Sequence, residues 1–302
     1  MPDSSAKLDA ASVAAELIAV IVAVTDGQPR VLTIEEGSAL PSGPFEFGHR
    51  SLQAGLRSWV ERQTHHPLGY VEQLYTFADR DRTGGAAERV VSISYLGLTR
   101  EARVAGDPGA EWLSWYRFFP WEDCRGVDAA AGEVLVSPLR AWAGSDRLRQ
   151  HRLAVNFGQD GHRWNEELVL QRYETMWEAG LVPEAGGDTG IPGQPMAHDH
   201  RRILATGIAR LRAKIKYRPV VFELMPPSFT LLQLQRAVES LAGRLLHKQN
   251  FRRLIDQQDL VEETGEVTTE TGGRPAKLFR FRREILAERA VVGTKLPLVR
   301  AV

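Results

Sequence analysis

The chain of 302 residues contains a single cysteine, Cys124. One thiol excludes an intrachain disulfide framework and a cysteine-rich zinc site, and we interpret it as a buried structural group. The N-terminal residues lack the basic start and long apolar core of a signal peptide. The apolar run from Ile18 to Val24 is too short to span a bilayer. We therefore expect a cytoplasmic protein without a membrane partner.

The protein also lacks an excess of either charge, since its formal net charge is zero. The charge is unevenly distributed, however: residues 200–218 contain seven lysines and arginines and no acid. Such a local excess of positive charge is typical of a nucleic-acid footprint. The apolar content of 43% is ordinary for a protein with a buried core, and the length favours two domains.

The segment from Pro219 to Arg283 has the order of parts of a winged helix-turn-helix. Apolar residues recur at helical spacing over residues 230–242, where Ser228 or Thr230 can cap the start and Gly243 can end the helix. A second short helix is predicted over residues 247–257, with Phe251, Leu254 and Ile255 on one face. Residues 260–263 and 277–282 then predict a β-hairpin around a polar tip, which is the wing.

The second helix presents residues suited to DNA at its N-terminal end, because arginine pairs with guanine, asparagine or glutamine pairs with adenine, and lysine neutralises phosphates. The candidate DNA-binding residues are Lys248, Gln249, Asn250, Arg252 and Arg253 on the helix, with Arg274 and Lys277 on the wing. The alternative is a helical hairpin and a strand pair with solvated charges. The order of helix, turn, basic helix and hairpin favours DNA binding.

The N-terminal half predicts a mixed sheet with one early helix. We expect a buried strand at residues 17–24, a return strand at 30–34, a helix at 51–64, and strands at 69–77 and 89–98. This order resembles the Nudix fold. A Nudix enzyme carries the box G-x5-E-x7-R-E-U-x-E-E-x-G-U, in which U is a bulky aliphatic residue and the helix glutamates hold magnesium.

The segment of matching position, Pro44 to His66, departs from this box almost everywhere. Arg50 replaces the first glutamate, Ser58 and Trp59 replace the Arg-Glu pair, and Arg62 and Gln63 replace the Glu-Glu pair. Hard cations need several carboxylates on one helical face. If the fold is Nudix, we therefore expect no catalytic residues, no metal site and no magnesium-dependent hydrolysis. An unrelated amphipathic helix is the alternative.

The whole chain resembles the Nudix-related transcriptional regulators of NAD metabolism, the NrtR family, and most of all their NadQ-type branch. The resemblance is carried by LRSWVERQT, GYVEQLYTF, WYRFFPWEDCR, RYETMWEAGLVPEA, LRAKIKYRPVVFELMPPSFTL, HKQNFRRLI and GRPAKLFRF. It implies an α+β architecture, with a Nudix-like mixed α/β ligand sensor over residues 1–195 and a winged helix-turn-helix over 196–302. It also implies a homodimer that represses NAD biosynthesis genes from a palindromic double-stranded operator, with NAD, ADP-ribose or ATP as the effector and no required cofactor.

In a Nudix relative the effector is expected beside the box helix, where Arg50, Arg57 and Arg62 are candidates to hold its phosphates. A second candidate site is the segment Glu111–Arg125, which holds three tryptophans, a tyrosine and two phenylalanines. There Trp115, Tyr116 or Trp121 would stack on a base, and Arg117 or Arg125 would bind phosphate. The alternative, which we favour, is that these aromatic residues form a domain or dimer seam.

Residues 184–195 are rich in glycine and proline and predict an inter-domain linker. In the following His198-Asp199-His200 we expect Asp199 to cap a helix between exposed histidines, rather than a metal site. Two other functions remain open: a Nudix-type ADP-ribose pyrophosphohydrolase, and a metabolite-sensing scaffold whose winged helix binds protein.

Overall fold

The computed structural model describes residues 13–79, 89–101, 109–126, 130–187, 190–269 and 275–284. Its N-terminal part is a six-stranded sheet of order β4-β5-β1-β2-β6, with β3 also paired to β1. The strands are β1 (Val13–Thr25), β2 (Gln28–Ile34), β3 (Ser42–Pro44), β4 (Tyr70–Phe77), β5 (Arg89–Leu98) and β6 (Ala110–Ser114). Strands β1 and β5 run parallel and the other pairs run antiparallel, so the sheet is mixed.

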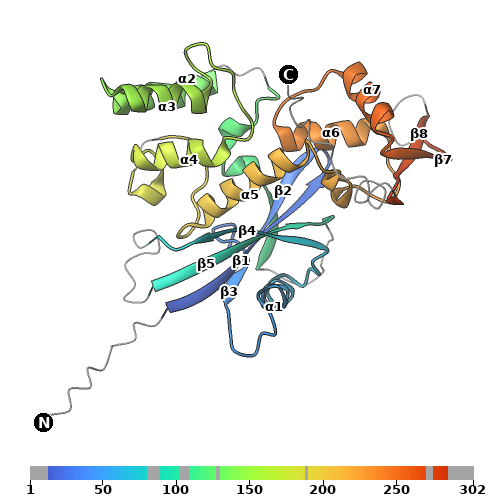
Figure 1. Cartoon of the computed structure of the whole chain (residues 1–302), viewed down its shortest axis with the longest axis horizontal. Helices are drawn as coiled ribbons and strands as arrows, with labels where there is room; N and C mark the ends of the chain where they lie inside the picture. The colour runs from blue at the N-terminus through green and yellow to red at the C-terminus, as the bar shows by residue number, and fades with distance from the viewer. Residues whose placement is uncertain are drawn as a thin grey trace, which may run out of the picture.

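The central strand β1 contains the apolar run predicted as a buried strand, and that prediction is confirmed. Its residues alternate between two hydrophobic clusters, because side chains of a strand point to opposite faces in turn. Leu17, Ala19 and Ile21 pack with helix α1 (Leu52–Thr64) on one face. On the other face lies α5 (His200–Lys214), as Figure 1 shows. Because both faces are covered, β1 is apolar without alternation.

Helix α5 lies close against the sheet, although it belongs to the second of the two domains expected from the sequence. Gly207 faces Val20 so closely that an added Cβ would lie 2.8 Å from a methyl carbon. At the C-terminal end of α5, Lys214 donates to the Tyr70 hydroxyl and pairs with Glu72, and both partners lie on β4. The charge cluster seen in residues 200–218 is thus partly used in packing: Arg201, Arg212 and Lys214 are buried.

Several elements were not predicted from the sequence. A helical hairpin of α2 (Ala130–Ala143) and α3 (Arg147–Phe157) precedes helix α4 (Val169–Glu178). Short 3-10 helices also occur, namely η1 (Trp115–Arg117), η2 (Pro120–Glu122), η3 (Pro183–Ala185) and η4 (Val220–Leu224). The hairpin lies beyond α4, on the side of the molecule away from α7 (Figure 1).

The C-terminal elements agree with the predicted winged helix-turn-helix. Helices α6 (Leu231–Ala242) and α7 (Lys248–Gln258) are followed by the antiparallel strands β7 (Val261–Thr268) and β8 (Ala276–Phe281). Strand β7 is longer than expected and continues through an irregular register between Glu263 and Val267. A bridge between Phe229 and Phe279 joins the wing to the chain that enters α6.

Candidate DNA interface and ligand pockets

Helix α7 buries one narrow face and exposes the rest. Phe251 and Ile255 are buried. All five candidate DNA-binding residues of this helix are exposed: Lys248, Gln249, Asn250, Arg252 and Arg253. Their side chains form no hydrogen bond or ion pair with another described residue. Unpaired cations and amides on one exposed helix are available to base edges and phosphates.

The turn before α7 is fixed by side chains of α6. Thr230 caps α6 in a reciprocal capping box with Gln233, and Gly243 ends the helix at a φ of 70°. The buried carboxylate of Glu239 accepts from the Leu246 backbone nitrogen at 2.9 Å and from Gln235 at 2.9 Å. These contacts set the angle at which α7 leaves α6.

The wing cations are already paired with carboxylates. Lys277 lies 2.8 Å from Glu263, and Arg280 lies 2.6 Å from Glu262. Both pairs are exposed, so a phosphate can compete for either cation at little cost. Arg274, the other candidate on the wing, lies outside the described residues.

The aromatic residues of Glu111–Arg125 other than Trp112 form a seam in the core shared by the sheet, α5 and α6, whereas Trp112 packs in the cluster on the α1 face of the sheet. Trp115, Phe118 and Phe119 are fully buried. The Tyr116 hydroxyl donates to the Ser240 carbonyl at 2.6 Å, and the Cys124 amide donates to the Gly243 carbonyl at 2.7 Å. In this conformation the Trp115 ring offers no face to a ligand. These contacts agree with the expectation of a domain seam. The Cys124 side chain is exposed, so the expectation that it is buried was wrong.

A buried ion triad lies at the centre of this seam. The Glu122 carboxylate accepts from Arg172 at 2.6 and 2.7 Å and from Arg212 at 2.6 Å, and all three side chains are inaccessible to solvent. Burial by itself would raise the pKa of Glu122, but the two guanidinium groups hold it below its usual value. Arg212 also donates to the Leu241 carbonyl at 2.8 Å, which attaches the triad to α6.

The arginines beside the box helix are separated by the structure. Arg57 donates to the carbonyls of Leu68 and Gly69 and so holds the start of β4. The Arg62 guanidinium lies 4.5 Å from the centre of the Trp59 ring, and Arg50 is exposed on the loop before α1. Arg117 is exposed on η1. Trp115 is fully buried, so it does not share an accessible site with the four arginines.

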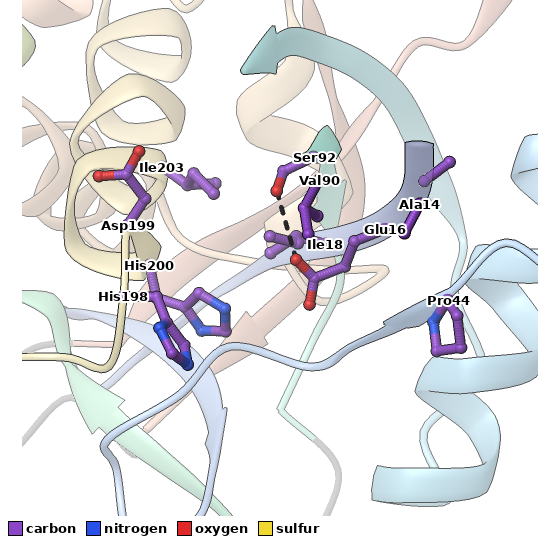
Figure 2. Close-up of a pocket in the computed structure, with 11 residues that line it drawn as sticks. Ala14, Glu16, Ile18, Pro44, Val90, Ser92, His198, Asp199, His200 and Ile203 are labelled. Atoms are coloured by element: carbon purple, nitrogen blue, oxygen red, sulfur yellow. Dashed lines mark hydrogen bonds between the residues drawn. The ribbon is translucent and has the colours of Figure 1, made fainter. Parts of the chain in front are cut away.

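A pocket of about 300 Å³ lies between β1, β5 and the start of α5 (Figure 2). Its polar residues are Glu16, Ser92, His198, Asp199 and His200, and none of the described residues that line it is an arginine. Ser92 donates to Glu16 at 3.3 Å. The sequence offered one signal for this pocket, the His-Asp-His run, which we interpreted as a helix start.

The two histidines of that run differ in environment. His198 is exposed, but His200 is buried, so the expectation that both are exposed was wrong for His200. Its Nδ1 accepts from the Leu40 amide at 2.9 Å. Burial lowers the pKa of His200 to about 4, so the ring is neutral at pH 7. Asp199 stands at the helix start without a side-chain capping bond and pairs with Arg202 at 3.3 Å instead.

Helix α1 carries one carboxylate, Glu61, and no acid in its first turn. Across the described residues, no group of three or more histidine, cysteine, aspartate or glutamate side chains is placed to hold a metal ion. In the same part of the chain, no helix has the length and apolar character needed to cross a membrane.

Together these elements define a winged helix-turn-helix module packed on a mixed-sheet domain. Residues 221–281 match the family model described as the NrtR DNA-binding winged helix domain. A curated relative from Acinetobacter baylyi, the ADPR responsive transcriptional repressor NtrR, is 42% identical over 86 residues. That match covers 28% of this chain and 34% of the relative, so the chain spans about a third of the length of this relative.

Solved structures extend the likeness to the whole fold. NrtR from Shewanella oneidensis, in complex with a 27mer DNA, matches with a TM-score of 0.56 and 21% identity, over 88% of this chain and 93% of that one. A MutT/nudix family protein from Enterococcus faecalis matches with a TM-score of 0.55 and 16% identity, over 93% and 89% of the two chains. The α+β architecture, a Nudix-like domain followed by a winged helix, is therefore confirmed.

Proposed function

We propose that this protein is a transcriptional repressor that binds operator DNA through its winged helix and responds to ADP-ribose. The observation that carries the proposal is α7, whose exposed cations and amides lie beside a wing in a segment that matches a DNA-binding family model. In this proposal Arg252 and Arg253 contact base edges, and Lys248 contacts phosphate. By resemblance, the operator is palindromic, the protein is a homodimer of the NadQ-type branch, and the genes are those of NAD biosynthesis.

ADP-ribose is the first candidate effector because the Acinetobacter relative is described as responsive to it. NAD and ATP, which share the adenosine and phosphate groups, are the next candidates. We place the effector in the Nudix-like domain, with its ribose in the pocket of Figure 2, which the start of α5 completes and where Glu16 offers carboxylate oxygens to hydroxyl donors. Residues 196–302 then respond through the seam described above.

We also infer that the Nudix-like domain does not hydrolyse ADP-ribose. Magnesium-assisted cleavage needs several carboxylates on the box helix, and α1 supplies one. Incubation of the protein with ADP-ribose and magnesium should therefore release no AMP. Steady release of AMP that is lost in a Glu61→Gln variant would make the hydrolase the better assignment.

The DNA-binding proposal is tested by fluorescence anisotropy of a labelled duplex from upstream of NAD-synthesis genes, across salt concentrations and with each nucleotide. We expect tight binding that weakens steeply with salt and is shifted by ADP-ribose. Arg252→Ala and Arg253→Ala should each cost about 1–3 kcal/mol of operator binding. Arg236→Ala, an exposed arginine on α6, is the control.

Two outcomes would count against the repressor. Equal affinity of both arginine variants and the unchanged protein would mean that α7 does not read the operator. Weak binding to every duplex would instead favour the scaffold function, in which the winged helix binds a protein.

A further inference from the structure

A groove in the winged-helix module has no role in the function proposed above. It has a cavity volume of about 510 Å³ and runs between the end of α5, η4, α6 and α7. Its apolar lining includes Val221, Leu234, Val238, Phe251, Leu254 and Ile255. It is separate from the pocket of Figure 2, because the two share no lining residue.

The groove keeps large apolar side chains in contact with solvent. Leu254 on α7 is 54% exposed, and Tyr217 after α5 is 59% exposed. Both line the groove together with the fully buried Leu234. Single exposed apolar residues are common on proteins, but a concave group of them indicates a surface that binds an apolar body.

The same groove carries an excess of positive charge. Lys216, Arg218 and Arg244 line it, whereas Glu166 is the single carboxylate among its described lining residues. Glu166 lies 2.9 Å from Lys216 and 3.4 Å from Arg244. The Arg218 side chain forms no hydrogen bond or ion pair with another described residue. The lining thus already holds one carboxylate and has a cation left for another anionic group.

We propose that this groove binds a small amphipathic organic anion, with an aromatic or aliphatic body and one carboxylate, sulfonate or phosphate group. The body would remove the apolar side chains of α6 and α7 from water, which is the main favourable contribution. The anionic group would form charge-assisted hydrogen bonds with Arg218 and Arg244. The site does not depend on what the Nudix-like domain binds.

Its position connects the groove to α7. Phe251, Leu254 and Ile255 form its wall on that helix, so a bound molecule lies directly behind the exposed face that carries Arg252 and Arg253. Arg212 of the buried triad also lines the groove. An occupant therefore contacts the recognition helix and lies next to the seam.

The test uses a matched pair of fluorescent probes on the full chain. 8-Anilinonaphthalene-1-sulfonate carries an aromatic body and one negative charge, and N-phenyl-1-naphthylamine has the same body without the charge. We expect one sulfonate probe to bind per chain, and the neutral probe to bind at least about tenfold more weakly, because it lacks the charge-assisted contacts. Equal affinity for the two probes would remove the anionic part of the proposal.

Variants then locate the probe. Arg218→Ala and Arg244→Ala should each weaken binding of the sulfonate probe about three- to tenfold and leave the neutral probe unchanged. Both side chains are exposed, so these variants should fold normally. Val238→Trp should fill the groove and abolish binding of both probes, whereas Arg236→Ala on the same helix should change neither.

Two results would overturn the proposal. One is sulfonate binding that survives in both arginine variants and in Val238→Trp, which places the probe elsewhere. The other is fluorescence of the sulfonate probe per chain that falls as the protein concentration rises. That result would mean that a second copy of the chain closes the groove. Operator affinity measured with and without the sulfonate probe is a separate readout: lack of DNA binding would reject the repressor but not this site.

Discussion

Replacement of Glu122 by glutamine tests whether the buried triad holds the two modules together. The substitution preserves the shape of the side chain but removes its charge. Arg172 and Arg212 would then remain buried with no carboxylate between them. The new amide group also presents a donor to guanidinium groups that only donate.

The expected loss of stability follows from the two buried arginines that remain without their carboxylate. Glu122 accepts three short hydrogen bonds from the two arginines, and its side chain is inaccessible to solvent. Removal of one partner from a buried ion pair typically costs about 3–5 kcal/mol, because a buried charge stays uncompensated. We therefore expect Glu122→Gln to lower the free energy of unfolding by about that amount.

The assay is urea unfolding followed by tryptophan fluorescence and by circular dichroism. Glu178→Gln is the control, because Glu178 pairs with Arg152 on the surface, where the expected loss is within about 1 kcal/mol. If Glu122→Gln unfolds within 1 kcal/mol of the unchanged protein, the reasoning is refuted, because solvent would then be compensating the two arginines. Two transitions in place of one would show that the modules unfold separately.

Three further predictions concern stability. Gly243→Ala should lower the free energy of unfolding more than Gly180→Ala does in the same assay. Both glycines have a positive φ, but only at Gly243 would the new Cβ lie 2.2 Å from a backbone oxygen, that of Glu122. Thr230→Ala should lower the free energy of unfolding by about 0.5–2 kcal/mol through loss of the α6 cap, and Thr230→Ser should restore most of it; no loss would mean that the cap is not formed in solution. His200 has a pKa lowered to about 4, so the unfolded chain takes up its proton first as pH falls. Stability should therefore decrease from about pH 6.5 down to about pH 4, by roughly 2 kcal/mol at pH 5, and His200→Asn should flatten this dependence in unfolding curves measured at pH 8 and pH 5.

The local patterns of the sequence determined the elements to which we assign the proposed function. The apolar run of β1, the amphipathic helices and the alternating residues of the wing each have a period that one kind of element satisfies. The start of α6 at Thr230 and its end at Gly243 also followed, because capping and left-handed geometry depend on neighbouring residues. The exposed face of α7 was predictable from the helical spacing of its apolar residues.

Local patterns identify the short strands that complete the sheet less clearly. Strand β3 is three residues long, and β6 overlaps the start of the aromatic run that we interpreted only as a seam or a ligand site. The hairpin of α2 and α3 was not predicted, although Asp146 caps α3 with its side chain. Short strands depend on partners that are distant in the chain, so local periodicity does not identify them.

The sequence by itself determined that this chain has a mixed-sheet domain without the acids of a Nudix box, and a winged helix whose second helix carries exposed basic residues. Tertiary structure alone decided which charged residues remain available. Arg212 and Arg252 are the same residue type, yet one lies at the centre of a buried triad and the other faces solvent. The difference arises because burial and ion pairing are set by residues far away in the sequence, here Glu122 and Leu241, which only the folded chain brings together.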